Sequence, residues 1–208
     1  MKIHLYINDI PDNLAFSDSV AIDTEAMGLK NHRDRLCVVQ LSGGDKHCHV
    51  VHFPKAEFEK AVNLRKLLLN KSLKKIFHYA RFDVAILMHT FGIKIDNIYC
   101  TKIVSRLVRT FTSRHGLKDL CKDLLAVELS KQEQTSDWGA LELTKEQLNY
   151  AATDVLHLHA LKEILDRLII RENRGELIQA CFEFLPYRAQ LDLLAGENFD
   201  VFPYQVME

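Results

Sequence analysis

Two acidic residues stand close together in a segment that is otherwise typical of a buried strand. Asp23 and Glu25 are two residues apart in the run VAIDTE, residues 20–25. Because alternate residues of a strand point to the same face, both carboxylates would lie side by side. A bound divalent cation would offset their repulsion and their desolvation. The alternative is an exposed strand face with two solvated acids, which is the commoner outcome for such a short motif taken alone.

A third acid, Asp83, lies among apolar residues where a helix is expected to begin. It stands in the run HYARFDVAIL, residues 78–87. The helix dipole favours acidic residues in the first turn, so a structural role would also explain Asp83.

A tyrosine and a fourth acid share one face of a later predicted helix. Tyr150 and Asp154 are four residues apart in YAATD. This spacing places the phenol beside the carboxylate, so that both could serve one site. The alternative is a partly buried tyrosine whose hydroxyl is satisfied by a neighbouring acid.

These motifs in this order resemble the DEDD exonucleases that carry a tyrosine in their third motif, and the ribonuclease D family in particular. The similarity extends over about residues 20–168. It includes the runs RLCVVQLS (35–42) and LSKQEQTSDWGALELTKEQLNYAATDV (129–155). The resemblance implies an α/β domain of the ribonuclease H-like fold, with a five-stranded mixed sheet flanked by helices. It also implies 3′-to-5′ exoribonuclease activity.

The resemblance assigns a role to each motif residue. Asp23, Glu25 and Asp154 would hold the cation that carries the attacking water, and Asp23 and Asp83 would hold a second cation near the leaving 3′ oxygen. Two ions roughly 4 Å apart are typical of this chemistry. Oxygen ligands favour Mg²⁺ or Mn²⁺. Tyr150 would orient the water, since a phenol with a pKa of about 10 is a poor base.

A basic segment without acids could contact the substrate. Its basic residues are Lys102, Arg106, Arg109, Arg114, His115 and Lys118. Of these, Arg109, Arg114 and Lys118 are candidate phosphate contacts on a cleft rim. A solvated helix face explains the segment equally well.

A transition-metal site around His47 is not favoured. His47 and His49 would share one strand face, whereas Cys48 would point away. No spaced pair of partners completes a tetrahedral set with them or with His52.

The elements that must position these residues follow from periodicity and from turn signals. An antiparallel meander is expected over residues 19–26, 35–42 and 46–53, with shorter strands at 73–79 and 97–100. Helices are expected at 56–69, 80–91, 101–110, 116–126 and 175–194. Thr144 and Gln147 form a capping-box pattern that opens one long helix to about Leu168.

The composition is typical of one compact domain. The chain has 208 residues, of which 48% are hydrophobic, so its core is large enough for independent folding. We expect a single domain over residues 1–208, with a nuclease core at about 20–168 and a helical extension at about 172–208. The five scattered cysteines, together with the lack of a signal-like or membrane-spanning run, indicate a soluble cytoplasmic protein.

The expected partner is single-stranded nucleic acid with a free 3′ end, and RNA is preferred by resemblance alone. A DNA exonuclease of the proofreading or Werner type would carry the same acids. A catalytically silent binding protein is the other alternative, although all four acids and the tyrosine are present. The net charge of −1 gives no global attraction for nucleic acid. Bacterial ribonuclease D carries helical C-terminal domains after its nuclease region; we expect none here, and processivity and oligomeric state stay open.

Overall fold

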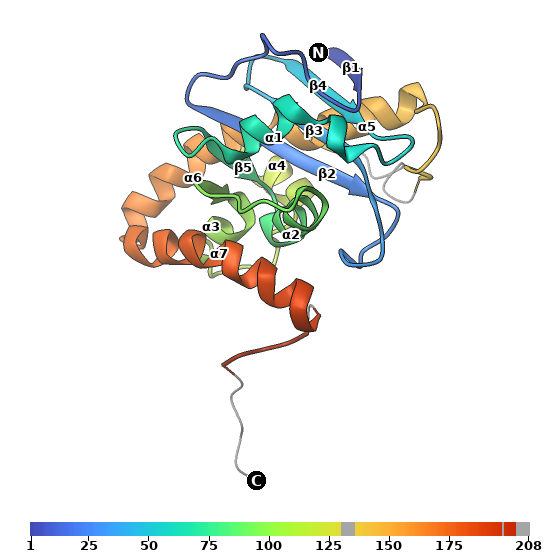
Figure 1. Cartoon of the computed structure of the whole chain (residues 1–208). Coiled ribbons are helices and arrows are strands. Elements are labelled where there is room, and N and C mark those ends of the chain that lie inside the picture. The colour runs from blue at the N-terminus through green and yellow to red at the C-terminus, as the bar shows by residue number, and fades with distance from the viewer. Residues whose placement is uncertain (130–135, 197, 203–208) are drawn as a thin grey trace.

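The computed structural model describes residues 1–129, 136–196 and 198–202 and is built around a six-stranded mixed sheet. The strand order is β1-β4-β3-β2-β5-β6 (Figure 1). The strands are β1 (Lys2–Ile7), β2 (Ser19–Ala26), β3 (Leu36–Ser42), β4 (His47–His52), β5 (Lys74–Phe77) and β6 (Ile98–Cys100). β2, β3 and β4 pair antiparallel, which confirms the predicted meander, and the other neighbouring pairs are parallel.

The sheet has one strand more than the five that the resemblance implied. The additional strand is β1, which pairs in parallel with β4 at one edge of the sheet. Its side chains also pack on those of β4, because His4 lies 3.1 Å from His47 and the Tyr6 hydroxyl lies 3.0 Å from His49 in hydrogen-bond contact. The remainder of the prediction, a mixed sheet flanked by helices, is confirmed.

Seven α-helices of the described chain pack around the sheet. They are α1 (Val62–Leu69), α2 (Ala80–Phe91), α3 (Thr101–Val108), α4 (Leu117–Leu125), α5 (Lys145–Leu156), α6 (Leu158–Glu172) and α7 (Gly175–Ala195), with a short 3₁₀ helix, η1, at Phe58–Lys60. None of the helices in the described ranges has the combined length and apolarity that crossing a membrane requires.

The long helix predicted after Thr144 is divided into two at His157. The first part, α5, packs against β2, β3 and β4, whereas α6 packs against α3, α4 and β5 (Figure 1). His157 is the single residue between the two helices, and the helices on either side of it have different packing partners. The prediction of one continuous helix was therefore wrong, although its start was correct.

The last helix, α7, is part of the same hydrophobic core as the sheet. Ile178, Phe182 and Leu185 are buried in that core. The helix also packs against α2, and the guanidinium of Arg81 donates two hydrogen bonds of 2.6 and 2.7 Å to the carboxylate of Asp192. The beginning of α2 is therefore fixed directly to the end of α7.

We predict that Thr144→Ala lowers the free energy of unfolding by about 1 kcal/mol. The Thr144 hydroxyl accepts from the backbone N–H of Gln147, and the Gln147 side chain accepts from the backbone N–H of Thr144, so the capping box is complete. Urea unfolding would measure the loss. Thr110→Ala, at an exposed position outside any helix, is the matched control and should stay within about 0.5 kcal/mol of wild type. Equal effects of the two substitutions would contradict this role of the cap.

Candidate active site

The centre of the site is a group of three carboxylates from two elements. Asp23 and Glu25 come from β2, a central strand between β3 and β5, and Asp154 comes from α5. Each offers one carboxylate oxygen, and these three oxygens lie within 4.8 Å of one another. The packing of α5 on β2 therefore joins two motifs that are more than one hundred residues apart in the sequence.

The fourth acid, Asp83, lies against this group from the first turn of α2. Its side chain is buried, and its Oδ1 accepts a hydrogen bond of 2.7 Å from the Thr24 hydroxyl. The negative charge of Asp83 acts on both Asp23 and Glu25. The structure therefore brings all four predicted acids to one place.

Tyr150 lies one helical turn before Asp154 and donates a hydrogen bond to its carboxylate. Its ring packs beside Trp138, with 6.1 Å between ring centroids. Burial, followed by the negative charge of Asp154, raises the pKa of Tyr150 above its ordinary value. The phenol is therefore protonated at neutral pH and can act as a hydrogen-bond donor.

Burial and mutual repulsion disfavour the charged forms of the acids. Burial raises the pKa of Asp23, and the charges of Asp83, Asp154 and Glu25 raise it further. Burial, then Asp154 and Asp83, raises the pKa of Glu25 to about 9. Burial also raises the pKa values of Asp83 and Asp154 to about 7, although the hydrogen bonds from Thr24 and Tyr150 oppose this.

This donor set fits a divalent metal ion. In the described part of the chain, no basic side chain forms an ion pair with any of the four acids. Converging carboxylate oxygens without a cationic neighbour are the ligands that hard divalent cations prefer.

The acids open into a cavity of about 660 Å³. Its wall also contains basic and aromatic side chains from the start of α2, α3 and α4, and apolar side chains that follow β2. Its other lining residues include Met27, Leu29, His78, Tyr79, Phe82, Lys102, Lys118 and Trp138. Leu29 and Met27 are largely exposed, at 77% and 59%. The cavity thus combines a negative centre with an apolar rim.

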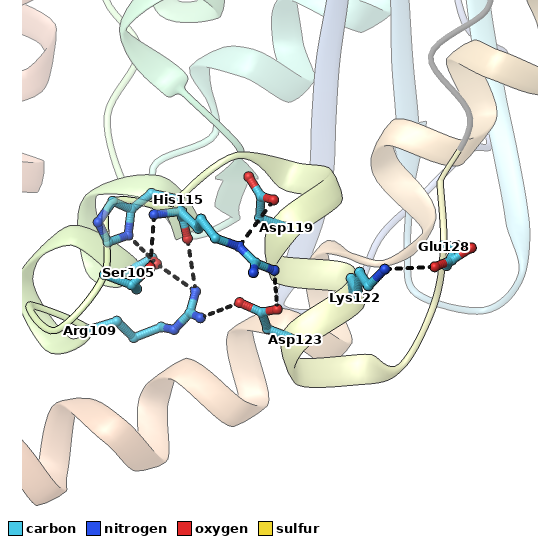
Figure 2. A network of polar contacts seen from close by, with 9 residues as sticks. Ser105, Arg109, His115, Asp119, Lys122, Asp123 and Glu128 are labelled. Carbon is cyan, nitrogen blue, oxygen red and sulfur yellow. Dashed lines mark hydrogen bonds and ion pairs between the residues drawn. The ribbon is translucent and has the colours of Figure 1, made fainter.

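The three predicted phosphate contacts lie in different environments. Lys118 lines the cavity. Arg109 is 4% exposed, and its guanidinium donates at 2.7 Å to Asp123 (Figure 2). Arg114 forms ion pairs with Asp119 and with the same Asp123.

The prediction that Arg109 lies on the rim of the cleft is therefore wrong. Arg109 is buried, and its ion pair with Asp123 joins α4 to the segment after α3. The carboxylates that hold Arg109 and Arg114 lie at positions 119 and 123, just beyond the acid-free segment, which ends at Lys118. Neither arginine is among the residues that line the cavity.

Sequence reasoning missed two residues of the site. Thr24 lies between the two acids of the first motif and holds Asp83. His78 lines the cavity, and its Nδ1 lies 2.8 Å from the Thr101 hydroxyl in hydrogen-bond contact. The only feature of the sequence that could have indicated these two residues is their nearness to the predicted acids. Thr24 lies between Asp23 and Glu25, and His78 lies five residues before Asp83.

Comparison with known proteins gives consistent matches in sequence. The family model described as 3′-5′ exonuclease matches residues 7–170. The ribonuclease D of Acidiphilium cryptum is 34% identical over 163 residues, which cover 78% of this chain and 41% of that protein. The ribonuclease D of Gluconacetobacter diazotrophicus is 31% identical over 81% of this chain and 42% of that protein. The chain thus spans about two fifths of the length of these relatives.

Solved structures match over most or nearly all of the chain. Brucella melitensis NrnC with bound Mg²⁺ is 49% identical with a TM-score of 0.92, and the match covers 99% of this chain and 100% of that one. The same protein bound to pGG is 50% identical with a TM-score of 0.93 and the same coverage. Escherichia coli RNase D, at 22% identity and a TM-score of 0.72, covers 83% of this chain and 45% of that one and shares the fold. Because the family model covers most of the chain, the chain belongs to the 3′-5′ exonuclease family.

Proposed function

We propose that this protein is a metal-dependent exonuclease that hydrolyses nucleic acid from the 3′ end. The observation that carries the proposal is the convergence of Asp23, Glu25 and Asp154 within 4.8 Å in a cavity that Asp83 also lines. Family membership and the order of the motifs support it.

The four acids would hold two Mg²⁺ or Mn²⁺ ions, with Asp23, Glu25 and Asp154 on one and Asp23 and Asp83 on the other. When bound, such ions supply positive charge that activates water and stabilises the leaving oxygen. A relative of 49% identity has been solved with bound Mg²⁺, which supports the choice of metal.

The protein side chains would orient the reactants. The protonated Tyr150 hydroxyl, fixed next to Asp154, would position the attacking water by hydrogen bonding rather than act as its base. The Thr24 hydroxyl would hold the carboxylate of Asp83 in a single orientation. Catalysis would then depend mainly on positioning and on charge stabilisation.

The proposed substrate is a short stretch of single-stranded nucleic acid, with RNA preferred. The ribonuclease D relatives and the NrnC structure with pGG support this choice. A cavity of about 660 Å³ is in the range of small-ligand pockets, about 300–1,000 Å³. The exposed Leu29 and Tyr79 side chains offer apolar and aromatic surfaces on which bases could pack.

A 3′-to-5′ DNA exonuclease is the second candidate. It is favoured by a match of 34% identity over 140 residues to DNA polymerase I of Aquifex aeolicus, which covers 67% of this chain and 22% of that protein. Purified protein incubated with RNA and DNA oligomers of matched sequence, labelled at the 5′ end, would separate the candidates. We expect Mg²⁺- or Mn²⁺-dependent shortening that stops in EDTA and is faster on RNA. Faster shortening of DNA would favour the second candidate, and no shortening of either would exclude both.

We also propose that the chain forms one domain that works in the cytoplasm. The core shared by the sheet and α7 supports a single domain. The four buried cysteines are all free, and free thiols are usual in a reducing compartment.

We predict that Asp154→Asn lowers turnover by about 100-fold or more, because it replaces a proposed carboxylate ligand with a neutral amide and so removes one negative charge from the metal site. Tyr150→Phe should lower turnover less, by roughly 10- to 100-fold, and should leave metal affinity nearly unchanged. Oligomer shortening and Mn²⁺ titration would measure the two effects.

The control for both variants is Glu146→Gln, an exposed acid on the same helix, which should leave turnover unchanged. Circular dichroism should show that all three variants are folded. Undiminished turnover in folded Asp154→Asn would rule out the proposed site.

We predict that the metal-free protein loses stability as the pH rises from 7 to 9. The raised pKa of Glu25, about 9, means that the folded state keeps a proton that the unfolded state has released. Stability therefore falls as pH rises towards this value. Melting temperature in EDTA should fall by roughly 2–4 °C for each kcal/mol lost. Adding Mg²⁺ or Mn²⁺ at pH 8 should restore it.

Glu25→Gln removes the titrating group and provides the comparison. Its melting temperature in EDTA should depend less on pH over the same range than that of the wild type. Parallel profiles for the two proteins would show that Glu25 is ionised in the folded state without metal.

A further inference from the structure

Lys102 is a cation at the edge of the cavity without an anionic partner among the described residues. It lines the cavity from the first turn of α3, and none of the ion pairs or hydrogen bonds of the described chain uses its ammonium group. Of the three basic residues predicted as phosphate contacts, Arg109 and Arg114 are each held by a carboxylate, whereas Lys118 lines the cavity as Lys102 does. Unlike both arginines, Lys102 is therefore available to bind an anionic ligand.

Three features of its surroundings disfavour the positive charge of Lys102. Partial burial and the nearby charge of Arg106 lower its pKa. In addition, Lys102 is the second residue of α3, where the helix dipole is positive, and no acid is present in that first turn. A negatively charged ligand in the cavity would offset the unfavourable effect of all three features on the charged ammonium group.

The ammonium group is nevertheless held in a defined place. It lies 4.0 Å from the centre of the Tyr79 ring, which is a favourable cation–π contact. The adjacent Thr101 fixes the start of α3, because its hydroxyl donates to the Phe77 carbonyl at 3.2 Å and contacts His78 at 2.8 Å. Tyr79 itself precedes α2, the helix that carries Asp83. Lys102 is therefore positioned relative to the acids by short, direct links.

Tyr79 also marks the boundary between two cavities. It lines the cavity of the acids and a neighbouring cavity of about 220 Å³, and Leu29 and Phe82 line both as well. A substrate whose scissile bond lies at the acids could continue past Tyr79 into the neighbouring space. A substrate phosphate other than the scissile one would then pass near the ammonium group.

We propose that Lys102, seated on the Tyr79 ring, binds a non-scissile phosphate of the substrate and thereby sets how the strand end is placed at the acids. This inference rests on the proposed function. Phosphate contacts of this kind fix the register of a nucleic acid without reading its sequence. The phosphate could be a 5′-terminal monoester of a very short substrate or an internal diester of a longer one.

The test compares Lys102→Gln with Arg106→Gln, which removes the same charge from an exposed position of the same helix outside the cavity lining. Two pairs of substrates are used. The first pair is a dinucleotide with a 5′-phosphate and the same dinucleotide with a 5′-hydroxyl. The second pair is a tetranucleotide with ordinary linkages and one with a neutral methylphosphonate at the linkage on the 5′ side of the scissile bond.

We expect Lys102→Gln to lower kcat/KM by about 10- to 100-fold on the fully charged member of one pair, mainly through KM. On the neutral member of that pair the loss should be at most about twofold. The pair that responds identifies the phosphate as terminal or internal. Arg106→Gln should change kcat/KM by no more than about threefold on every substrate.

Several outcomes would overturn the inference: no loss in Lys102→Gln, an equal loss on charged and neutral substrates, or an equal loss in Arg106→Gln. Binding of the same labelled substrates to the Asp154→Asn variant, with and without Lys102→Gln, gives a second measurement that does not require turnover. If the wild type fails to shorten any substrate, the proposed exonuclease function fails, while the binding comparison still decides whether Lys102 recognises a phosphate.

Discussion

The repulsion among four converging carboxylates, of which Asp83 is buried and the other three are half-buried, is the constraint on which the rest of the site depends. Asp23, Glu25, Asp83 and Asp154 converge without an ion-paired base among the described residues, so the folded chain holds charges that disfavour one another and that burial disfavours further. Such an arrangement is stable only if protons or cations neutralise it. The sheet, the start of α2 and the packing of α5 together supply the rigidity that keeps these acids in place.

The local parts of this arrangement could be predicted from the sequence. The alternation around Asp23 predicted its strand, the apolar spacing before Gly92 predicted α2, and the capping box at Thr144 predicted the start of α5. In each case the signal lies within a few residues of the feature. The convergence of the acids was inferred from family resemblance, because no local sequence pattern indicates which helices and strands pack against one another.

The errors have one physical origin, which is packing between distant segments. β1 is an edge strand that pairs with a strand far along the chain, β4, with Lys2 opposite His47, and the helices α5 and α6 on either side of His157 pack on different elements. Arg109 was expected on a rim because positive charge in a sequence suggests solvent or phosphate. Its partner, Asp123, becomes a neighbour only when α4 folds back. Lys102, in contrast, has no carboxylate partner among the described residues.

The pair between Arg81 and Asp192 connects the C-terminal helix to the nuclease centre. Arg81 is two residues before Asp83, and Asp192 also receives hydrogen bonds of 2.6 and 3.1 Å from Arg188. A chain shortened before Asp192 would lose an anchor of the helix that carries a proposed metal ligand. None of the described residues after 172 belongs to the cluster of acids, but this part of the chain helps to hold Asp83 in place through the contact between α7 and α2.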